Sequence, residues 1–110
     1  MLTLKVTERL LSLLNMLERK HGIMNLDSHQ REFLEFVVRQ NAANKIVTPN
    51  DVVDLALTSR SSTYRKLADM RALNLLKEEW IDGQCRLTAA EGTTEFLNSL
   101  QTGIQLLASQ

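Results

Sequence analysis

The sequence predicts a mainly α-helical domain with one small β-hairpin, and three features point to this fold class. Hydrophobic residues recur at helical spacing along most of the 110 residues, which indicates amphipathic helices. The dipeptide Asp82-Gly83 stands between the β-prone runs Trp80-Ile81 and Cys85–Leu87, which is the strongest short signal for a hairpin. Capping-box patterns that begin at Thr48 and at Thr88 mark the starts of two helices.

The first helix is expected from Leu2 to His21, with Gly22 as its end. Its apolar surface is wider than one neighbouring helix would cover. A face of this kind packs either on the chain's own core or on a second copy. The residues that widen it are Leu2, Leu4, Leu11 and Met16.

Either Asp27 or Ser28 caps the next helix. The segment 41–44 is then a polar connection, and residues 45–47 (Lys-Ile-Val) are expected to form a small strand beside the hairpin. The core residues expected from this second helix are Phe33, Leu34, Phe36, Val37 and Val38.

A short third helix begins at Thr48, whose hydroxyl can accept from the backbone N–H of Asp51 while the Asp51 carboxylate reaches back. Pro49 fits the first helical position because its missing N–H would have no partner there. The inward face of this helix is expected to be Val52, Leu55 and Ala56.

The fourth helix is capped by one of the serines at positions 59, 61 and 62. Asn74 follows it at a place where helices often end in the left-handed conformation that Asn tolerates. The residues expected to face the core are Thr63, Leu67, Met70 and Leu73. The opposite face then holds Ser61, Ser62, Arg65 and Asp69, flanked by Tyr64, Lys66 and Ala68.

The last helix is expected from Ala89 to Ala108, with Thr88 and Glu91 as its capping box. Gly103 interrupts it and indicates either a bend or a close contact. Its apolar stripe comprises Phe96, Leu97, Leu100, Ile104 and Leu107.

The segment 48–88 resembles the winged helix-turn-helix of the multiple-antibiotic-resistance regulator (MarR) family. The resemblance rests on Ser61–Leu67, the helix exit Leu73–Leu76, the step Leu87-Thr88 with Gly92 after it, and the upstream segment Leu26–Leu34. Asn74 stands where the family usually has Gly, and the short wing lacks the family's frequent Asp-x-Arg. The resemblance implies one winged-helix domain over 1–110, with a DNA-binding part at 45–88 and dimerisation helices at 1–24 and 89–110.

A helix of this kind fits the major groove, where each base pair presents a distinct pattern of donors and acceptors. Arg65 lies one turn beyond the serines and is the residue expected at a base edge, preferably guanine. The other expected DNA contacts are Ser61, Ser62 and Tyr64 at phosphates or bases, Arg60 and Lys66 at phosphates, and Gln84 or Arg86 from the wing. Tyr64 could instead lie at the edge of the core, and Trp80 is expected to pack under the wing. A twofold dimer predicts half-sites about one helical turn apart, roughly 34–36 Å.

Positive charge is concentrated on this segment, which indicates that it, and not the rest of the chain, is the DNA-binding part. The sequence has 13 basic and 13 acidic residues and no net charge. Between residues 58 and 77, however, five cations stand against Asp69 alone, a local net charge of +4 that the remainder balances. A local basic patch on a neutral chain still attracts phosphates, although more weakly than a basic protein does.

Other classes of function find little support in the sequence. No apolar run approaches the roughly 18 residues of a membrane span, and no signal-peptide pattern is present. His21 and His29 have no Cys or acidic partner at ligand spacing, so no metal site, cofactor or enzymatic activity is expected. The lone Cys85 fits a reducing cytoplasm and is either a buried apolar residue or a redox sensor.

The leading hypothesis is therefore a cytoplasmic, homodimeric, sequence-specific regulator that binds double-stranded DNA and acts as a repressor. The alternative is a winged-helix module for protein association, or for DNA binding in plasmid or phage replication or partition. A small-molecule effector is common in the resembled family, but no residue here identifies one.

Overall fold

A computed structural model describes residues 4–109 of the chain. Within these residues it contains helices, one 3-10 turn (η1) and a two-stranded antiparallel sheet. No helix among them has the length and apolarity required to cross a membrane. In chain order, the elements are α1 (Leu4–Lys20), η1 (Ile23–Asn25), α2 (Ser28–Ala42), α3 (Pro49–Val53), α4 (Arg60–Ala72), β1 (Leu76–Ile81), β2 (Gln84–Ala89) and α5 (Glu91–Ala108).

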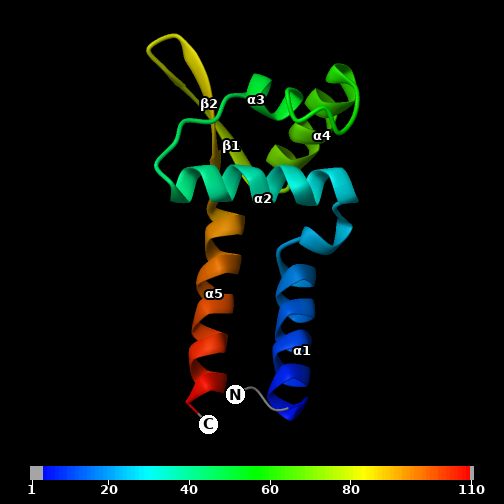
Figure 1. The fold of residues 1–110 in the computed structure, drawn as a ribbon, viewed down its shortest axis with the longest axis vertical. Coiled ribbons are helices and arrows are strands. Elements are labelled where there is room, and N and C mark those ends of the chain that lie inside the picture. The colour runs from blue at the N-terminus through cyan, green and yellow to red at the C-terminus, as the bar shows by residue number, and fades with distance from the viewer. Residues whose placement is uncertain (1–3, 110) are drawn as a thin grey trace.

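The molecule has two parts, which lie on opposite sides of α2 (Figure 1). Helices α1 and α5 run antiparallel, side by side, and form a stalk. Helices α3 and α4 and the hairpin lie at the other end, and together with α2 they form what we call the winged body. The radius of gyration is 15.6 Å, whereas a compact chain of this length would have about 13 Å. The stalk therefore extends out of the folded body and leaves much of its surface uncovered.

The hydrophobic core lies where α2 crosses α4 and the hairpin. Phe33 and Val37 of α2 are fully buried, as are Leu67 and Met70 of α4 and Leu75 just after it. Phe33, Val37, Leu67 and Met70 lie at the helical spacing predicted from the sequence, whereas Leu75 was not among the predicted core residues. Phe36 and Val38, also expected in this core, are only partly buried. Leu73, expected to face the core, is 40% exposed because the helix ends there and Asn74 turns away with a φ of 60°.

The ends of the first two helices follow local rules. Helix α1 ends before Gly22, which has a left-handed φ of 76°. The predicted start at Leu2 lies outside the described residues. Asp27, one of the two expected caps, begins α2 with a full capping box, in which its carboxylate and the Gln30 side chain each accept from the other residue's backbone N–H.

The segment 45–47 does not form the predicted strand. It makes one backbone hydrogen bond to the hairpin, from the N–H of Leu87 to the carbonyl of Val47 at 2.7 Å. Asn41 extends this pairing, since its side chain accepts from the Ala89 N–H at 3.1 Å and donates to the Leu87 carbonyl. The outer edge of β2 is thus satisfied by a loop and a helix end, and a third strand is not needed.

Helix α3 has the predicted cap but is shorter than expected. Thr48 and Asp51 form the capping box, with Pro49 in the first turn. Val52 is fully buried, whereas Ala56 is exposed and has a left-handed φ of 56°. The prediction that Ala56 faces inward is wrong, because the chain has already left the helix after Val53.

The hairpin has the predicted two-residue turn. Asp82 and Gly83 both have positive φ, 52° and 76°, which matches the twist of the flanking strands. The register pairs Trp80 with Cys85 and Ile81 with Gln84. Trp80 is 72% exposed. The prediction that it packs under the wing is therefore wrong, because the hairpin extends past the core before it reaches this residue.

Helix α5 begins two residues later than predicted. Its N-cap is Ala90, and Thr88 lies within β2, so the predicted Thr88–Glu91 capping box is not formed. Thr93 instead fixes the first turn, since its hydroxyl donates to the Leu75 carbonyl at 2.6 Å. Gly103 marks a close contact: a Cβ there would lie 2.1 Å from a methyl group of Leu13 in α1.

Candidate nucleic-acid interface

Helix α4 presents one face to the core and the opposite face to solvent. Ser59 caps it by accepting from the Ser62 N–H at 3.2 Å. Thr63, Leu67 and Met70 are buried. The exposed face of the first turns, called here the α4 face, consists of Arg60, Ser61, Tyr64 and Arg65. Arg60 and Tyr64 are one turn apart, as are Ser61 and Arg65, so the four residues form two neighbouring rows on one side of the helix. Ser62 is only half-buried and lies beside this face.

The cations of α4 differ in how they are held. Among the described residues, no ion pair or side-chain hydrogen bond engages Arg65, which is exposed. Arg60 donates to the side chain of Asn50 at 3.1 Å and lies 5.8 Å from the centre of the Tyr64 ring. Arg65 is thus the cation of this helix whose charge is most available to an external anion.

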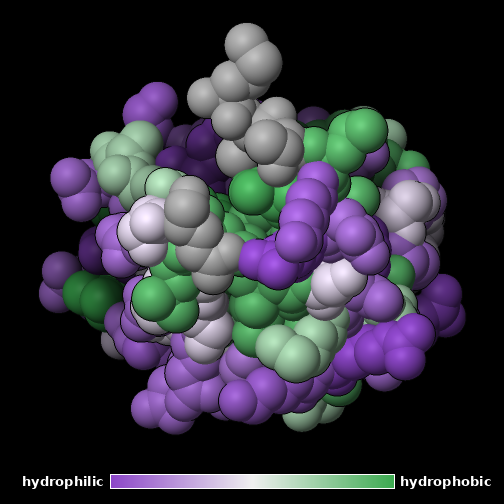
Figure 2. Space-filling view, turned by 90° about the horizontal axis from the view of Figure 1, so that it is seen from below, coloured by the Kyte–Doolittle hydropathy of each residue, from purple (hydrophilic) through white to green (hydrophobic). Residues whose placement is uncertain are grey.

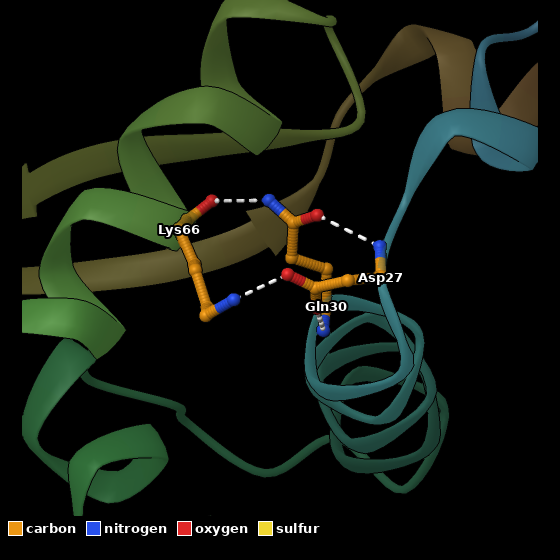
Figure 3. Close-up of polar contacts among 3 residues, drawn as sticks. All are labelled: Asp27, Gln30 and Lys66. Carbon is orange, nitrogen blue, oxygen red and sulfur yellow. Dashed lines mark hydrogen bonds and ion pairs between the residues drawn. The ribbon is translucent and has the colours of Figure 1, made fainter. Parts of the chain in front are cut away.

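Lys66 is held against α2 instead of pointing freely outward (Figure 3). Its ammonium pairs with the carboxylate of Asp27, and its backbone carbonyl accepts from the side-chain amide of Gln30 at 3.3 Å. Gln30 is buried. The bond from Lys66 is the main cause that holds the pKa of the Asp27 carboxyl below its usual value. Burial opposes it, and the Gln30 N–H adds a smaller effect in the same direction as Lys66. The two residues of the α2 capping box therefore hold the middle of α4 against α2.

The C-terminal half of α4 is fixed by a second ion pair. Arg71 contacts Glu78 of β1 at 2.9 Å, which joins the helix to the hairpin. Lys77, the next cation along the chain, pairs with Glu79 at 3.1 Å. Carboxylates of the protein itself therefore neutralise part of the local charge of +4 expected from the sequence.

The wing places its two candidate residues differently. Gln84 is exposed and lines a shallow hollow of about 500 Å³ together with Tyr64, Trp80 and the N-terminal turn of α3. Arg86 is half-buried, and its Nε is buried without a hydrogen-bond partner in the protein. Because Glu79 faces Arg86 in the register, both lie on the side of the hairpin away from Trp80. Gln84 lies on the same side as Arg86 by this alternation, but it borders the hollow beside the turn residue Gly83, whereas Arg86 does not line it.

Cys85 lines the same hollow and is partly buried. Burial raises the pKa of its thiol, and the neighbouring carboxylate of Glu78 raises it further. A thiol with a raised pKa has little thiolate at neutral pH, and the thiolate is the form that oxidants attack.

Sequence reasoning did not identify the residues that position this interface. Gln30 supports α4, Asn50 orients Arg60, and Asn41 holds the strand that bears the wing. The capping-box spacing from Asp27 to Gln30 was a visible signal for the first of these. Asn41 contacts a strand far along the chain, and Asn50 of α3 contacts the first residue of α4. No local sequence pattern indicates either contact.

A second concave surface lies beside the stalk. This apolar groove, of about 570 Å³, is formed mainly by Leu14 of α1, Leu34 and Val38 of α2, and Phe96 and Leu100 of α5. Ion pairs at its rim join Arg31 to Glu18 at 3.1 Å and Arg39 to Glu35. Across residues 4–109, no group of three or more His, Cys, Asp or Glu side chains is arranged to hold a metal ion.

The sequence matches no protein-family model, and no curated protein is similar to it. Among solved structures, the chain is similar to the crystal structure of a MarR-like transcriptional regulator from Thermotoga maritima, with a TM-score of 0.61 and 14% sequence identity. The similarity covers 99% of this chain and 79% of the other. It therefore includes the stalk as well as the helix-turn-helix and the hairpin. The chain therefore shares the winged-helix fold of that MarR-like regulator.

Proposed function

We propose that this protein is a homodimeric transcriptional regulator that binds double-stranded DNA in a sequence-specific way and represses transcription by covering a promoter. The observation that supports this best is the state of Arg65. It is exposed and without an ion pair on a helix in which Lys66 and Arg71 are bound by the protein's own carboxylates and Arg60 donates to the side chain of Asn50. An arginine in this position is free to donate two hydrogen bonds to one guanine edge.

The other residues of the α4 face are suited to contact the DNA backbone beside such a guanine. The Ser61 hydroxyl, the Tyr64 hydroxyl and the Arg60 guanidinium surround Arg65 with donors that suit phosphate oxygens. Lys66 would have to leave Asp27 to reach a phosphate, so we assign it mainly to positioning α4. Gln84 remains a candidate contact from the wing, and Arg86 a weaker one.

Dimerisation is proposed through the stalk, with residues 1–24 and 89–110 as the dimerising segments and 45–88 as the DNA-binding segment. Figure 2 looks onto the free end of the stalk and shows hydrophobic residues gathered in the middle of the view. Large apolar side chains on α1 and α5 are exposed: Leu4, Leu11, Met16, Leu97, Ile104 and Leu106. The accessible surface of 7136 Å² exceeds the roughly 6,200 Å² expected for a compact monomer of this mass. A second copy that covers these residues would remove the excess.

The oligomeric state is tested by sedimentation at micromolar concentration. We expect a species of twice the 12.5 kDa chain mass. A species of chain mass alone would exclude the twofold arrangement and the paired half-sites that follow from it. The proposed activity also requires access to the chromosome or a plasmid, and therefore a cytoplasmic location.

DNA binding is tested by selecting duplexes from a random-sequence pool and measuring affinities by anisotropy at several salt concentrations. We expect a preferred, pseudo-palindromic sequence and a steep fall of affinity with salt. The variant Arg65→Ala should lose about 1–3 kcal/mol on the selected duplex and less on a shuffled one. Arg39→Ala, which removes an exposed cation of α2 outside the proposed DNA-binding segment 45–88, is the matched control.

The outcomes separate the candidate functions. An equal loss for Arg65→Ala on all sequences would assign Arg65 to phosphate. Salt-dependent binding without sequence preference would favour an architectural role in replication or partition. The absence of both preference and salt dependence would favour a module for protein association, and would defeat the proposal.

A further inference from the structure

The most exposed aromatic side chain of the described residues lies on the wing and has no assigned role. Trp80, the single tryptophan of the chain, is 72% exposed near the end of β1. A tryptophan buries a large apolar area when it finds a partner, and its indole N–H can donate a hydrogen bond. In solvent Trp80 makes neither contact, so both its apolar surface and its indole N–H are available to an external partner.

Trp80 lies on the same surface as the α4 face. Tyr64 of α4 and Trp80 of β1 line one hollow, together with Thr48 and Asn50 at the start of α3. Figure 1 shows the hairpin, α3 and α4 at the end of the molecule opposite the stalk. A duplex that receives α4 in its major groove therefore extends past the hollow and along the wing.

The outer part of the wing cannot hold a duplex through charge. Residues 79–85 contain no Lys or Arg, but they do contain the carboxylates of Glu79 and Asp82. Lys77 is paired with Glu79, and Arg86 lies on the other side of the hairpin with its Nε buried. Any contact with DNA here must accordingly be made by uncharged groups and against some repulsion from Asp82.

We propose that Trp80 packs its indole against the sugar rings of the DNA strand that flanks the groove occupied by α4. This inference rests on the proposed function, because it needs α4 to lie in the groove. The wing would then contribute apolar contact area, and α4 the cations. An aromatic contact of this kind displaces no counterions, so its contribution to affinity does not depend on salt.

The proposed position of the wing predicts that removal of one negative charge strengthens DNA binding. If the wing lies along the duplex, the Asp82 carboxylate is close to phosphates and opposes binding. The variant Asp82→Asn removes this charge at nearly constant shape. Asn is favoured before Gly in this turn and tolerates the φ of 52°. We expect Asp82→Asn to bind the duplex about two- to fivefold more tightly at low salt, with the gain lost at high salt.

The direct experiment is a titration of Trp80 fluorescence in the full-length protein. The probe is a duplex that the wild-type protein recovers from a random-sequence pool, and binding is followed separately by anisotropy of the labelled duplex. We expect the duplex to change Trp80 emission and to protect the indole from quenching by acrylamide, over the same concentration range as the anisotropy change. Trp80→Ala should weaken binding about tenfold without a change in the salt slope. Trp80→Phe should restore most of the affinity.

Failure of this inference is distinguishable from failure of the proposed function. Duplex binding with unaltered Trp80 emission, or with wild-type affinity in both Trp80→Ala and Asp82→Asn, would place the wing away from the DNA and overturn the inference alone. No binding of the wild-type protein to any duplex would overturn both. A circular dichroism melt of each variant separates loss of folding from loss of contact, since an exposed residue should leave the melting temperature nearly unchanged.

Discussion

Gly92 joins the stalk to the exit of α4, and its replacement by alanine gives the sharpest test of the fold. Its N–H donates to the carbonyl of Asn74 at 3.0 Å. An alanine Cβ at this position would lie 2.5 Å from the same oxygen and 3.3 Å from its carbon. The oxygen belongs to the backbone, which cannot rotate away as a side chain can. The two segments must therefore separate by about 0.9 Å before the contact reaches 3.4 Å, the start of ordinary packing distances.

The free-energy balance follows from these contacts. Within an ordinary helix, a Gly→Ala change raises stability by up to about 1 kcal/mol. Here the separation weakens the Gly92–Asn74 hydrogen bond and disturbs the neighbouring bonds of Ala90 and Thr93 to the Leu75 carbonyl. Forced overpacking of this kind costs about 1–3 kcal/mol. We expect Gly92→Ala to lower the free energy of unfolding by about 1–3 kcal/mol despite its better helix propensity.

The assay is urea denaturation followed by circular dichroism at one fixed protein concentration, since the stability of the proposed dimer would depend on concentration. Gly103→Ala is the matched control in the same helix. Its Cβ would meet a terminal methyl group of Leu13, which a change of rotamer can move away. Its effect should be clearly smaller. A Gly92→Ala protein as stable as the wild type, or more stable, would refute the close approach on which the reasoning depends.

Three further predictions concern single residues outside α5. Ala56 has a left-handed φ of 56°, so Ala56→Gly should raise the free energy of unfolding by about 0.5–1 kcal/mol in thermal melts, whereas Ala72→Gly in α4 should lower it. Asp27 has a lowered native pKa, so its ion pair stabilises the fold above the ordinary carboxyl pKa of 3.8, and the stabilisation is lost as the pH falls below that value. Asp27→Asn keeps a capping residue and should cost less than about 1 kcal/mol at pH 7, with a difference from wild type that disappears in acid; a difference that persists in acid would assign the effect to the cap. The raised pKa of Cys85 predicts slower alkylation by iodoacetamide at pH 7 than that of glutathione, with a rate that increases on unfolding, and equal rates would contradict its burial.

The contacts at the start of α5 link the two parts of the molecule. Ala90, Gly92 and Thr93 all bond to carbonyls of Asn74 or Leu75, directly after α4. The stalk is therefore attached to the end of the helix proposed to bind DNA.

Local chemistry in the sequence determined the turns and most of the helix ends. The capping boxes at Asp27 and Thr48, the Asp82-Gly83 turn and the left-handed Asn74 depend on groups within a few residues of each other. Such contacts form in any context that allows the local backbone conformation. The helical spacing of Leu67 and Met70 likewise identified the buried side of α4.

Long-range packing decided which of these residues are available for function. Arg65 and Lys66 are adjacent cations that the sequence places at or beside the DNA-facing side of one helix, yet only Lys66 meets a carboxylate, from a residue 39 positions away. Trp80 is exposed because the hairpin is longer than the core that supports its base, and Thr88 lost its capping role because it pairs in β2. Charge neutralisation and burial depend on the groups that the whole fold brings together, and a residue's neighbours in the chain do not specify those groups.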